Sequence, residues 1–586
     1  MNQRRLFLGC FVSMIATALV FAVRGAVLND WGDQFGLTEE IKGMISGAGL
    51  YPFAITIILF SLIQDRIGYG RSMAIAFLAQ IAGTIVTITA HTWQMLYVGT
   101  FIYALGNGIV EAVINPVVAT LYGKNKTHWL NVLHAGWPAG LVLGGLLSIG
   151  VILGGDSIKK LTGQDPAAAK AQVAAAAGPN DAAGGKTQAD SDKIGAPVAQ
   201  TGWRLWQFQM AVTFVPVLIY GFLLLGQKFP VQERVAAGVS YMDMLKEFGW
   251  ASSYICFFLL TIAVNAILLV ANVQPASIWV QAAIAVVPTV LFGIYVRSFG
   301  RPMFVFLMLV MFLLATTELG TDSWISAIMQ SVLKSPIKGT LFLVYTSTIM
   351  FFLRFYAGPI VHKLSPLGLL AVCSAIACGG LFWLSAAGNA AFMLFLAATF
   401  YGCGKSFFWP TTLGIVSEQY PKGGALTLNA IAGAGVLAVG LIGAPLIGTV
   451  QDHKFAADIE AANKPLAAQV TTEKEGLFGM RSLALDAEKY NKAFAPLEGA
   501  DVSKPEALSA AQRELLKEKE TVDDLSVAAK QASLAKIALL PAGMFVCYVI
   551  LLIYFRAKGG YRAEVLAGHG AEDKRFTGGV AGPGEA

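Results

Sequence analysis

The sequence predicts an all-α polytopic membrane protein of fourteen spans, built from two six-helix repeats plus two extra central helices. Three observations support this fold class. Of the 586 residues, 56% are hydrophobic and only 13% are charged, whereas soluble globular proteins carry about 25% charged residues. Apolar runs of about 20 residues, long enough to cross a bilayer, recur along the whole chain. The second half of the chain also repeats features of the first half.

The fourteen apolar runs are expected to form the spans. Their approximate limits are 6–28, 44–64, 72–90, 94–121, 130–153, 204–226, 250–272, 277–297, 303–320, 340–361, 366–386, 390–416, 425–450 and 537–556. The first run follows two arginines, as a signal peptide would. It is long and no small-residue cleavage site follows it, so we expect it to be retained as a span.

The short loops alternate in charge and predict the orientation. Basic residues precede span 1 and occupy every second loop after it, while the opposite short loops, such as "AHTW" at 90–93, are nearly free of them. Because basic loops stay in the cytoplasm, we expect both termini to be cytoplasmic. We expect a multi-pass protein of the inner or plasma membrane.

Two long polar segments interrupt the spans, and both are expected on the outer face. Residues 154–203 are rich in Ala, Gly and Lys and are expected to be disordered or weakly helical. Residues 451–535 contain good helix formers with charge pairs four residues apart, which predict a helix or a helical hairpin.

An internal repeat sets the predicted domains. Shifted by 298 residues, the stretch 103–136 lies over 401–434 without a gap, and Asn131 and the loop residue Lys124 coincide with Asn429 and Lys422. The predicted domains are 1–228, a six-helix half with the insert 154–203; 248–298, an extra two-helix hairpin; 302–558, a second six-helix half with the insert 451–535; and 559–586, a cytoplasmic tail. Two parallel halves around a midplane site are the architecture of the major facilitator transporters.

The loop "QDRIGYGR" at 64–71 resembles the loop signature of the major facilitator superfamily. The residues that carry this resemblance are Asp65 at a helix end, Arg66, Gly68 allowing close approach, and Arg71. The resemblance implies a gating loop that clamps the two halves when the protein faces outward. An ordinary charged turn is the alternative.

Glu111, in "EAVINP" at 111–116, is the most informative residue. A charge at a bilayer centre costs at least about 2.5–3.5 kcal/mol, so such an acid faces a cavity, carries protons, or pairs with a neighbouring helix. Asn107 and Asn115 lie on the same helix face as Glu111. Pro116 removes a backbone hydrogen bond and frees a carbonyl group as an acceptor. We predict that Glu111 couples protons to transport and that Asn107 and Asn115 bind substrate.

The Glu-x-x-x-Asn-Pro pattern, followed by Leu130 and Asn131, resembles the fucose–proton symporter family, which includes glucose and galactose transporters. The resemblance implies that Glu111 takes part in proton coupling and sugar binding, and that Asn131 contacts the sugar. It also implies an acid in helix 1, for which Asp30 and Asp33 are candidates. Arg24 stands where the family pattern is apolar.

The second half supplies further candidate substrate-binding residues. Glu318 and Asp322 lie one turn apart, and Lys405 and Trp409 occupy the repeat positions of Asn107 and Glu111. Lys405 can pair with an acid such as Glu318 or Glu111, bind an anionic substrate group, or form a structural ion pair. The predicted substrate contacts here are Glu318, Lys405, Trp409 and Asn429. In the first half, His134 fits either a proton relay or a satisfied core histidine.

These observations predict a secondary active transporter, a proton-coupled sugar symporter working by alternating access. The alternatives are a transporter of an organic anion or other metabolite, which Lys405 favours, and a non-transporting membrane sensor. Without a phosphate-cradling Gly-Lys-Ser/Thr loop or a convergent acid–histidine cluster, we expect neither ATP-driven transport nor enzyme activity. The expected partners are a small-molecule substrate, protons and the bilayer, without nucleic acid, metal or cofactor, and the expected state is a monomer.

Overall fold

The structure is a computed structural model that describes residues 2–35, 37, 39–161, 204–269, 273–274, 276–475, 481–497, 502, 506, 508–564 and 566. These residues contain fourteen helical segments long and apolar enough to cross a membrane, which confirms the predicted number of spans. The chain is an all-α polytopic membrane protein, and its described residues also contain a small two-stranded sheet. Of the predicted insert 154–203, residues 154–161 continue a helix and the others lie outside the described residues.

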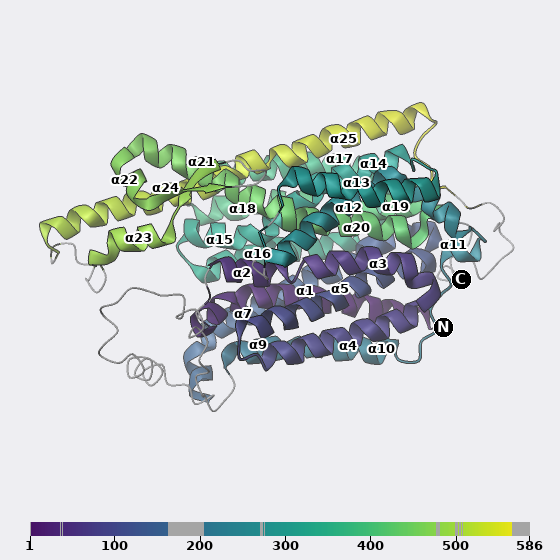
Figure 1. The fold of residues 1–586 in the computed structure, drawn as a ribbon, viewed down its shortest axis with the longest axis horizontal. Coiled ribbons are helices and arrows are strands. Elements are labelled where there is room, and N and C mark those ends of the chain that lie inside the picture. Colours follow the sequence, from purple (N-terminus) through teal and green to yellow (C-terminus); the bar gives the residue numbers. More distant parts are fainter. Residues whose placement is uncertain are drawn as a thin grey trace. The chain divides into compact units, whose positions relative to one another are not determined.

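The helices form two compact units, and unit 1 comprises Met1–Met244, Ser417–Gly433 and Glu564–Ala586. Its elements are α1 (Gln3–Phe35), α2 (Glu39–Gly47), α3 (Tyr51–Ile67), α4 (Tyr69–Ile88), α5 (Trp93–Leu121), η1 (Gly123–Asn125), α6 (Lys126–His134), α7 (Gly136–Leu161), α9 (Leu205–Val212), α10 (Phe214–Leu224), α11 (Glu233–Ala236) and η4 (Pro421–Gly423) (Figure 1). Glycines let these helices approach closely. A Cβ atom on Gly83 of α4 would lie 2.5 Å from the backbone nitrogen of Tyr103 in α5.

Unit 2 comprises Leu245–Val416 and Ala434–Ala563. Its elements are α12 (Tyr241–Leu269), α13 (Ile278–Val296), α14 (Pro302–Ala315), the π-helix η3 (Thr316–Gly320), α15 (Thr321–Leu333), α16 (Pro336–Phe355), α17 (Ala357–Ala386), α18 (Ala391–Lys405), α19 (Phe408–Gln419), α20 (Gly424–Ala438), the π-helix η5 (Val439–Gly443), α21 (Ala444–Ala462), α22 (Lys464–Val470), β1 (Thr471–Glu475), β2 (Arg481–Leu485), α23 (Ala487–Phe494), η7 (Ala495–Leu497), α24 (Ala510–Ile537) and α25 (Leu539–Ala557). Three of these helices cross the boundary between the units. Residues 241–244 of α12, 417–419 of α19 and 424–433 of α20 fall in unit 1.

Residues 451–535, called the outer domain after the side of the membrane predicted for them, contain the long helix α24 where a helix was predicted, and also a feature that was not predicted. Between α22 and α23, strands β1 and β2 pair antiparallel, with Thr471 opposite Leu485. The prediction of a helix or helical hairpin was therefore incomplete. The strand "TTEKE" lacks an apolar alternation that would predict a strand, and the sheet gains its support when Leu485 packs on the core of the outer domain.

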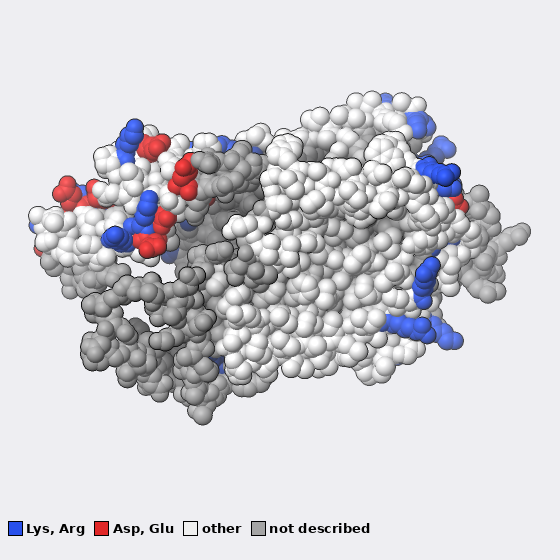
Figure 2. Space-filling model, in the orientation of Figure 1, with Lys and Arg blue, Asp and Glu red and all other residues white. Residues whose placement is uncertain are grey.

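The outer domain has its own hydrophobic core within unit 2. The buried residues of this core are Phe455, Ile459, Leu466, Ala467, Val470, Phe494, Leu497, Val522 and Ala529. Its surface carries Lys, Arg, Asp and Glu side chains together, whereas the visible faces of the membrane helices are almost free of charge (Figure 2). This contrast is what a hydrated domain attached to lipid-facing helices requires.

The sequence repeat has a counterpart in the backbone. Tyr122, which precedes η1, has φ −124° and ψ 52°, and Tyr420, which precedes η4, has φ −132° and ψ 51°. The 298-residue shift that aligns these two tyrosines also aligns the starts of α6 and α20. The domain boundaries inferred from the repeat stay a prediction.

Candidate functional site

The predicted polar stripe of α5 forms hydrogen bonds inside unit 1. Glu111 is buried, with 4% of its surface exposed, and its Oε2 accepts a hydrogen bond of 2.7 Å from Nδ2 of Asn115. The Oδ1 of Asn115 lies 2.9 Å from Nε2 of His134 on α6. Because this amide oxygen can only accept, His134 is the donor. Glu111, Asn115 and His134 therefore form one hydrogen-bonded chain.

Asn107 belongs to a second, separate network. Its Oδ1 accepts from Nε2 of Gln80 on α4 at 2.8 Å, and the hydroxyl of Tyr220 on α10 donates to Oε1 of Gln80 at 2.6 Å. The structure therefore brings Asn115 to Glu111 but ties Asn107 to two residues that the sequence analysis did not identify. Gln80 could have been identified from the sequence, because it is an amide side chain within a predicted apolar span.

Pro116 leaves the carbonyl of Ala112 without a helical hydrogen bond, as predicted, and a side chain donates to this carbonyl instead. A proline at position 116 cannot donate to the carbonyl of Ala112, four residues earlier. The Nδ2 of Asn429 donates to that carbonyl oxygen at 2.9 Å, while its Oδ1 is buried without a hydrogen-bond partner among the described residues. Asn429 thus lies beside α5 at Ala112, the residue that follows Glu111 in the sequence. Its repeat mate Asn131 donates to the carbonyl of Thr127 at 2.8 Å.

In unit 2, Glu318 lies on the π-helix η3 and is held by a residue that the sequence analysis missed. Nη2 of Arg354 on α16 donates to Oε1 of Glu318 at 2.9 Å, and the backbone nitrogen of Trp409 donates to Oε2 at 3.1 Å. Nε of Arg354 donates to the carbonyl of Ser406 at 2.7 Å, an acceptor freed by Pro410. Arg354 could have been identified from the sequence, because it is a charged residue inside the predicted apolar span 340–361.

Lys405 pairs with Asp322, not with Glu318 or Glu111. Its ammonium group also lies 5.2 Å from the centre of the Tyr401 ring. Lys405 is fully buried and Asp322 is 7% exposed, so the two residues form a buried ion pair. Glu318 lies on the π-helix η3 and Asp322 on α15, the α-helix that follows it.

Most buried charges of the described residues are compensated. The charged side chains that are less than one-tenth exposed are Arg24, Glu111, Lys126, Glu233, Arg234, Glu318, Asp322, Arg354 and Lys405. Six of them form three ion pairs, and Arg234 donates to the carbonyl of Val239. Within the part of the chain that the structure describes, neither Glu111 nor Arg24 forms an ion pair, and Glu111 accepts the hydrogen bond from Asn115.

The predicted gating loop is only partly described. Gly68 adopts φ 84°, which ends α3 and begins α4, and a Cβ atom there would meet nothing within 4 Å. Glycine is therefore required by the left-handed backbone, and the expected close approach at Gly68 was wrong. Arg66 and Arg71 are exposed, and the side chain of Asp65, like that of Asp33, lies outside the described residues. Asp30 on α1 is exposed.

The loop after α5 contains a buried ion pair in unit 1. Nζ of Lys126 lies 2.6 Å from Oε2 of Glu233 on α11 and 3.3 Å from the carbonyl of Ser417. The hydroxyl of Thr127 donates to Oε1 of Glu418 at 2.5 Å. These bonds attach α11, in the connection that follows α10, to the start of α6 and to the segment Ser417–Gly433.

We expect Lys126→Ala to destabilise the protein by about 3 kcal/mol, because it leaves Glu233 buried without its partner. Thermal unfolding of the purified protein measures the loss, and Lys124→Ala, an exposed lysine of the same loop, is the control. The exchange Lys126→Glu with Glu233→Lys should recover most of the loss. An unchanged midpoint for Lys126→Ala would show that this pair contributes nothing to stability.

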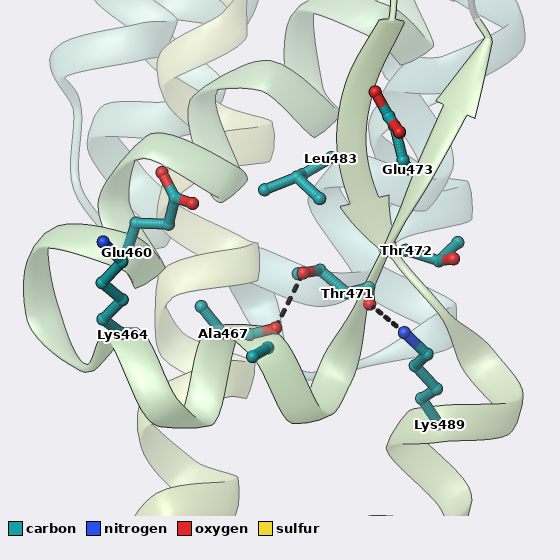
Figure 3. Close-up of a pocket in the computed structure, with 9 residues that line it drawn as sticks. Glu460, Lys464, Ala467, Thr471, Thr472, Glu473, Leu483 and Lys489 are labelled. Atoms are coloured by element: carbon teal, nitrogen blue, oxygen red, sulfur yellow. Dashed lines mark hydrogen bonds between the residues drawn. The ribbon is translucent and has the colours of Figure 1, made fainter.

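A pocket of about 300 Å³ lies in the outer domain, between α22 and the β1–β2 hairpin (Figure 3). Its lining residues are Glu460, Lys464, Ala467, Ala468, Thr471, Thr472, Glu473, Leu483 and Lys489. Lys489 donates to the carbonyl of Thr471 at 2.6 Å. The charged residues of this lining are exposed and of both signs. The buried groups that suit proton or solute binding lie instead in the membrane helices.

Comparison with known proteins identifies the fold. A family model described as the Major Facilitator Superfamily matches residues 6–157. The vacuolar basic amino acid transporter 5 of Saccharomyces cerevisiae (strain ATCC 204508 / S288c) is 21% identical over 135 residues, which cover 23% of this chain and 23% of that protein. The chain thus spans about a quarter of the length of this curated relative.

Three solved structures share the architecture over most of the chain. A bacterial homologue of the human drug peptide transporters PepT1 and PepT2 has a TM-score of 0.54 and 12% identity, covering 95% of this chain and 100% of its own. A bacterial homologue of the human lysosomal transporter Spinster has a TM-score of 0.52 and 14% identity, covering 95% and 97%. The proton:xylose symporter XylE has a TM-score of 0.51 and 13% identity, covering 78% and 90%. The predicted major facilitator fold is confirmed. The closer resemblance to the fucose–proton symporters stays a prediction.

Proposed function

We propose that this chain, which has the major facilitator fold, is a secondary active transporter that couples proton movement to symport of a small polar solute, with a sugar as the solute class. One observation carries the proposal. Glu111 is buried in α5 and accepts a hydrogen bond from Asn115, yet it has no cationic partner among the described residues.

A proton is the simplest compensation for such an acid. A buried carboxylate without a counter-ion is unfavourable by several kcal/mol, and binding a proton removes the charge. Glu318 differs because Arg354 compensates its charge. We therefore assign proton coupling to Glu111, and we assign Glu318 and Lys405 to holding unit 2 together rather than to solute contact.

The amide groups near Glu111 support a hydroxyl-bearing solute. The buried Oδ1 of Asn429 accepts no hydrogen bond within the described chain, and a sugar hydroxyl supplies a donor for it. The Glu-x-x-x-Asn-Pro resemblance and the fold shared with a proton:xylose symporter agree with this solute class. Asn131 and Trp409 remain proposed solute contacts, as do Asn107 and Asn115.

Reconstitution into proteoliposomes tests the function. With the lumen alkaline, we expect labelled hexoses or pentoses to accumulate above equilibrium, and a protonophore should abolish the accumulation. Uptake that ignores the pH gradient for every sugar transported would overturn proton coupling. The absence of any sugar transport would overturn the solute class.

Transport of an organic anion is the second candidate, and the uncompensated charge of Arg24 favours it. The third candidate is a membrane sensor that does not transport. Its function would lie in the two long polar segments, 154–203 and 451–535, so deleting them would destroy it.

We expect deletion of 456–530, or of 155–202, to leave solute transport largely intact, because the proposed proton and solute groups all lie in membrane helices. Uptake per reconstituted protein, compared with the full chain, measures this. Joining Phe455 to Gln531 with a short Gly/Ser linker preserves the helices on either side. Loss of transport in a deletion variant that keeps its thermal stability would favour the sensor.

A further inference from the structure

Arg24 is a buried cation to which the proposed sugar symport assigns no role. It lies on α1 with 9% of its surface exposed. Among the described residues it takes part in no ion pair, and no hydrogen bond from its guanidinium group is present. Burying a guanidinium group, with its five N–H donors, is strongly unfavourable unless acceptors compensate it. Among the described residues, this buried cation therefore has no hydrogen-bond acceptor.

Phe21 and Gly49 enclose the guanidinium group of Arg24 within unit 1, and this arrangement is here called the cradle. Its Cζ lies 5.6 Å from the centre of the Phe21 ring, one turn earlier on α1. A Cβ atom on Gly49 would lie 1.7 Å from Nη1 and 2.1 Å from Cζ of Arg24. The guanidinium group thus occupies the space that the missing side chain of Gly49 leaves open, at the break between α2 and α3.

The position of Arg24 along α1 places the cradle at one end of the span. Arg24 follows Arg4 by twenty residues, which corresponds to a rise of about 30 Å along the helix. The first span ends at Leu28, so the cradle lies near the end opposite to the N-terminus, which is the outer end in the predicted orientation. A solute that approaches from outside reaches this end first.

We propose that Arg24, held between Phe21 and Gly49, binds the carboxylate group of an acidic solute. The proposal rests on the transport function proposed above and narrows the solute from a sugar to an organic anion such as a sugar acid. The planar guanidinium group pairs with a carboxylate through two parallel hydrogen bonds. The phosphate of a lipid headgroup offers the same chemistry, and the experiment below distinguishes the two sources.

The test uses two solutes that differ only at one group, glucose and glucuronate, with the purified full chain in detergent. We expect glucuronate to stabilise the wild type against thermal unfolding at lower concentration than glucose. Arg24→Gln should weaken glucuronate binding by about 30-fold or more, since losing one partner of a buried charge pair has effects of this size. It should leave glucose binding unchanged.

Two further variants and a control keep the result interpretable. Gly49→Ala keeps the charge but fills the cradle, so it should also weaken glucuronate binding. Arg24→Lys should retain part of the affinity, because its charge remains while the two-bond geometry is lost. Arg513→Gln, which removes an exposed arginine of α24, should behave as the wild type.

The outcomes separate this inference from the proposed function. If neither glucuronate, acetate nor inorganic phosphate stabilises the wild type in an Arg24-dependent way, the inference is wrong, while pH-driven uptake of a neutral sugar would still support symport. If glucuronate binds through Arg24 but neither glucuronate nor any neutral sugar accumulates in proteoliposomes under a pH gradient, symport is wrong and the anion site stands. An Arg24-dependent effect of added anionic phospholipid alone assigns the cradle to lipid and overturns the solute site.

Discussion

Glu111→Gln is expected to abolish pH-driven accumulation of solute in proteoliposomes while leaving downhill exchange of the same solute partly intact. The glutamine keeps the size of the side chain and still accepts a hydrogen bond from Asn115, which lies 2.7 Å away in the wild type. It cannot gain or lose a proton in the relevant pH range. Alternating access can therefore continue, but the proton gradient no longer drives it.

The measurement compares two assays on the same reconstituted protein. Counterflow exchange without a pH gradient reports movement of the solute, and uptake with an alkaline lumen reports coupling. Glu473→Gln, at an exposed acid of the outer domain, is the matched control and should preserve both activities. Uphill uptake at the wild-type level in Glu111→Gln would exclude Glu111 as the proton site. We also expect the exchange rate of this variant to lose its dependence on pH.

Arg354→Met is expected to produce the largest loss of stability, about 3–5 kcal/mol, because it leaves Glu318 charged and buried without a partner. It also removes the donor to the Ser406 carbonyl, which Pro410 leaves without a backbone partner. Thermal unfolding in detergent measures the effect as a midpoint lowered by several degrees. Arg66→Met, at an exposed arginine, controls for the loss of an arginine as such.

A double variant separates the ion pair from general packing. Glu318→Gln with Arg354→Met removes both charges, so it should unfold much closer to the wild-type temperature than Arg354→Met alone. If the two variants unfold at the same temperature, the uncompensated charge of Glu318 is not the cause of the loss.

The spans and the polar stripe of α5 could be predicted from the sequence because both depend on local patterns. A run of apolar residues has few alternatives to a membrane helix, and residues four apart lie on one face of it. Asn115 accordingly bonds to Glu111 within one turn. The freed carbonyl near Pro116 was also predictable, since it follows from the covalent structure of proline.

The partners across helices could not be predicted, because they depend on how helices pack. Asn429 reaches the Ala112 carbonyl from 317 residues away in the chain, and no local pattern encodes that contact. Lys405 pairs with Asp322 and Arg354 with Glu318, and both acids lie in a segment where the π-helix η3 interrupts the α-helix. Single-sequence periodicity assumes a regular α-helix and misses this interruption.

The junction of α24 and α25 has a mechanical consequence. Hydrogen bonds continue across it, from the nitrogen of Ala538 to the Leu534 carbonyl and from that of Ala542 to the Ala538 carbonyl, so Ala510–Ala557 acts as one 48-residue rod. The 28 residues of α24 alone extend about 40 Å. A tilt of α25 by about 10° would therefore displace the far end of α24 by about 7 Å. If the outer domain moves rigidly with α25, it would act as a lever arm, and a fluorescence label at its far end would report small movements of that membrane helix.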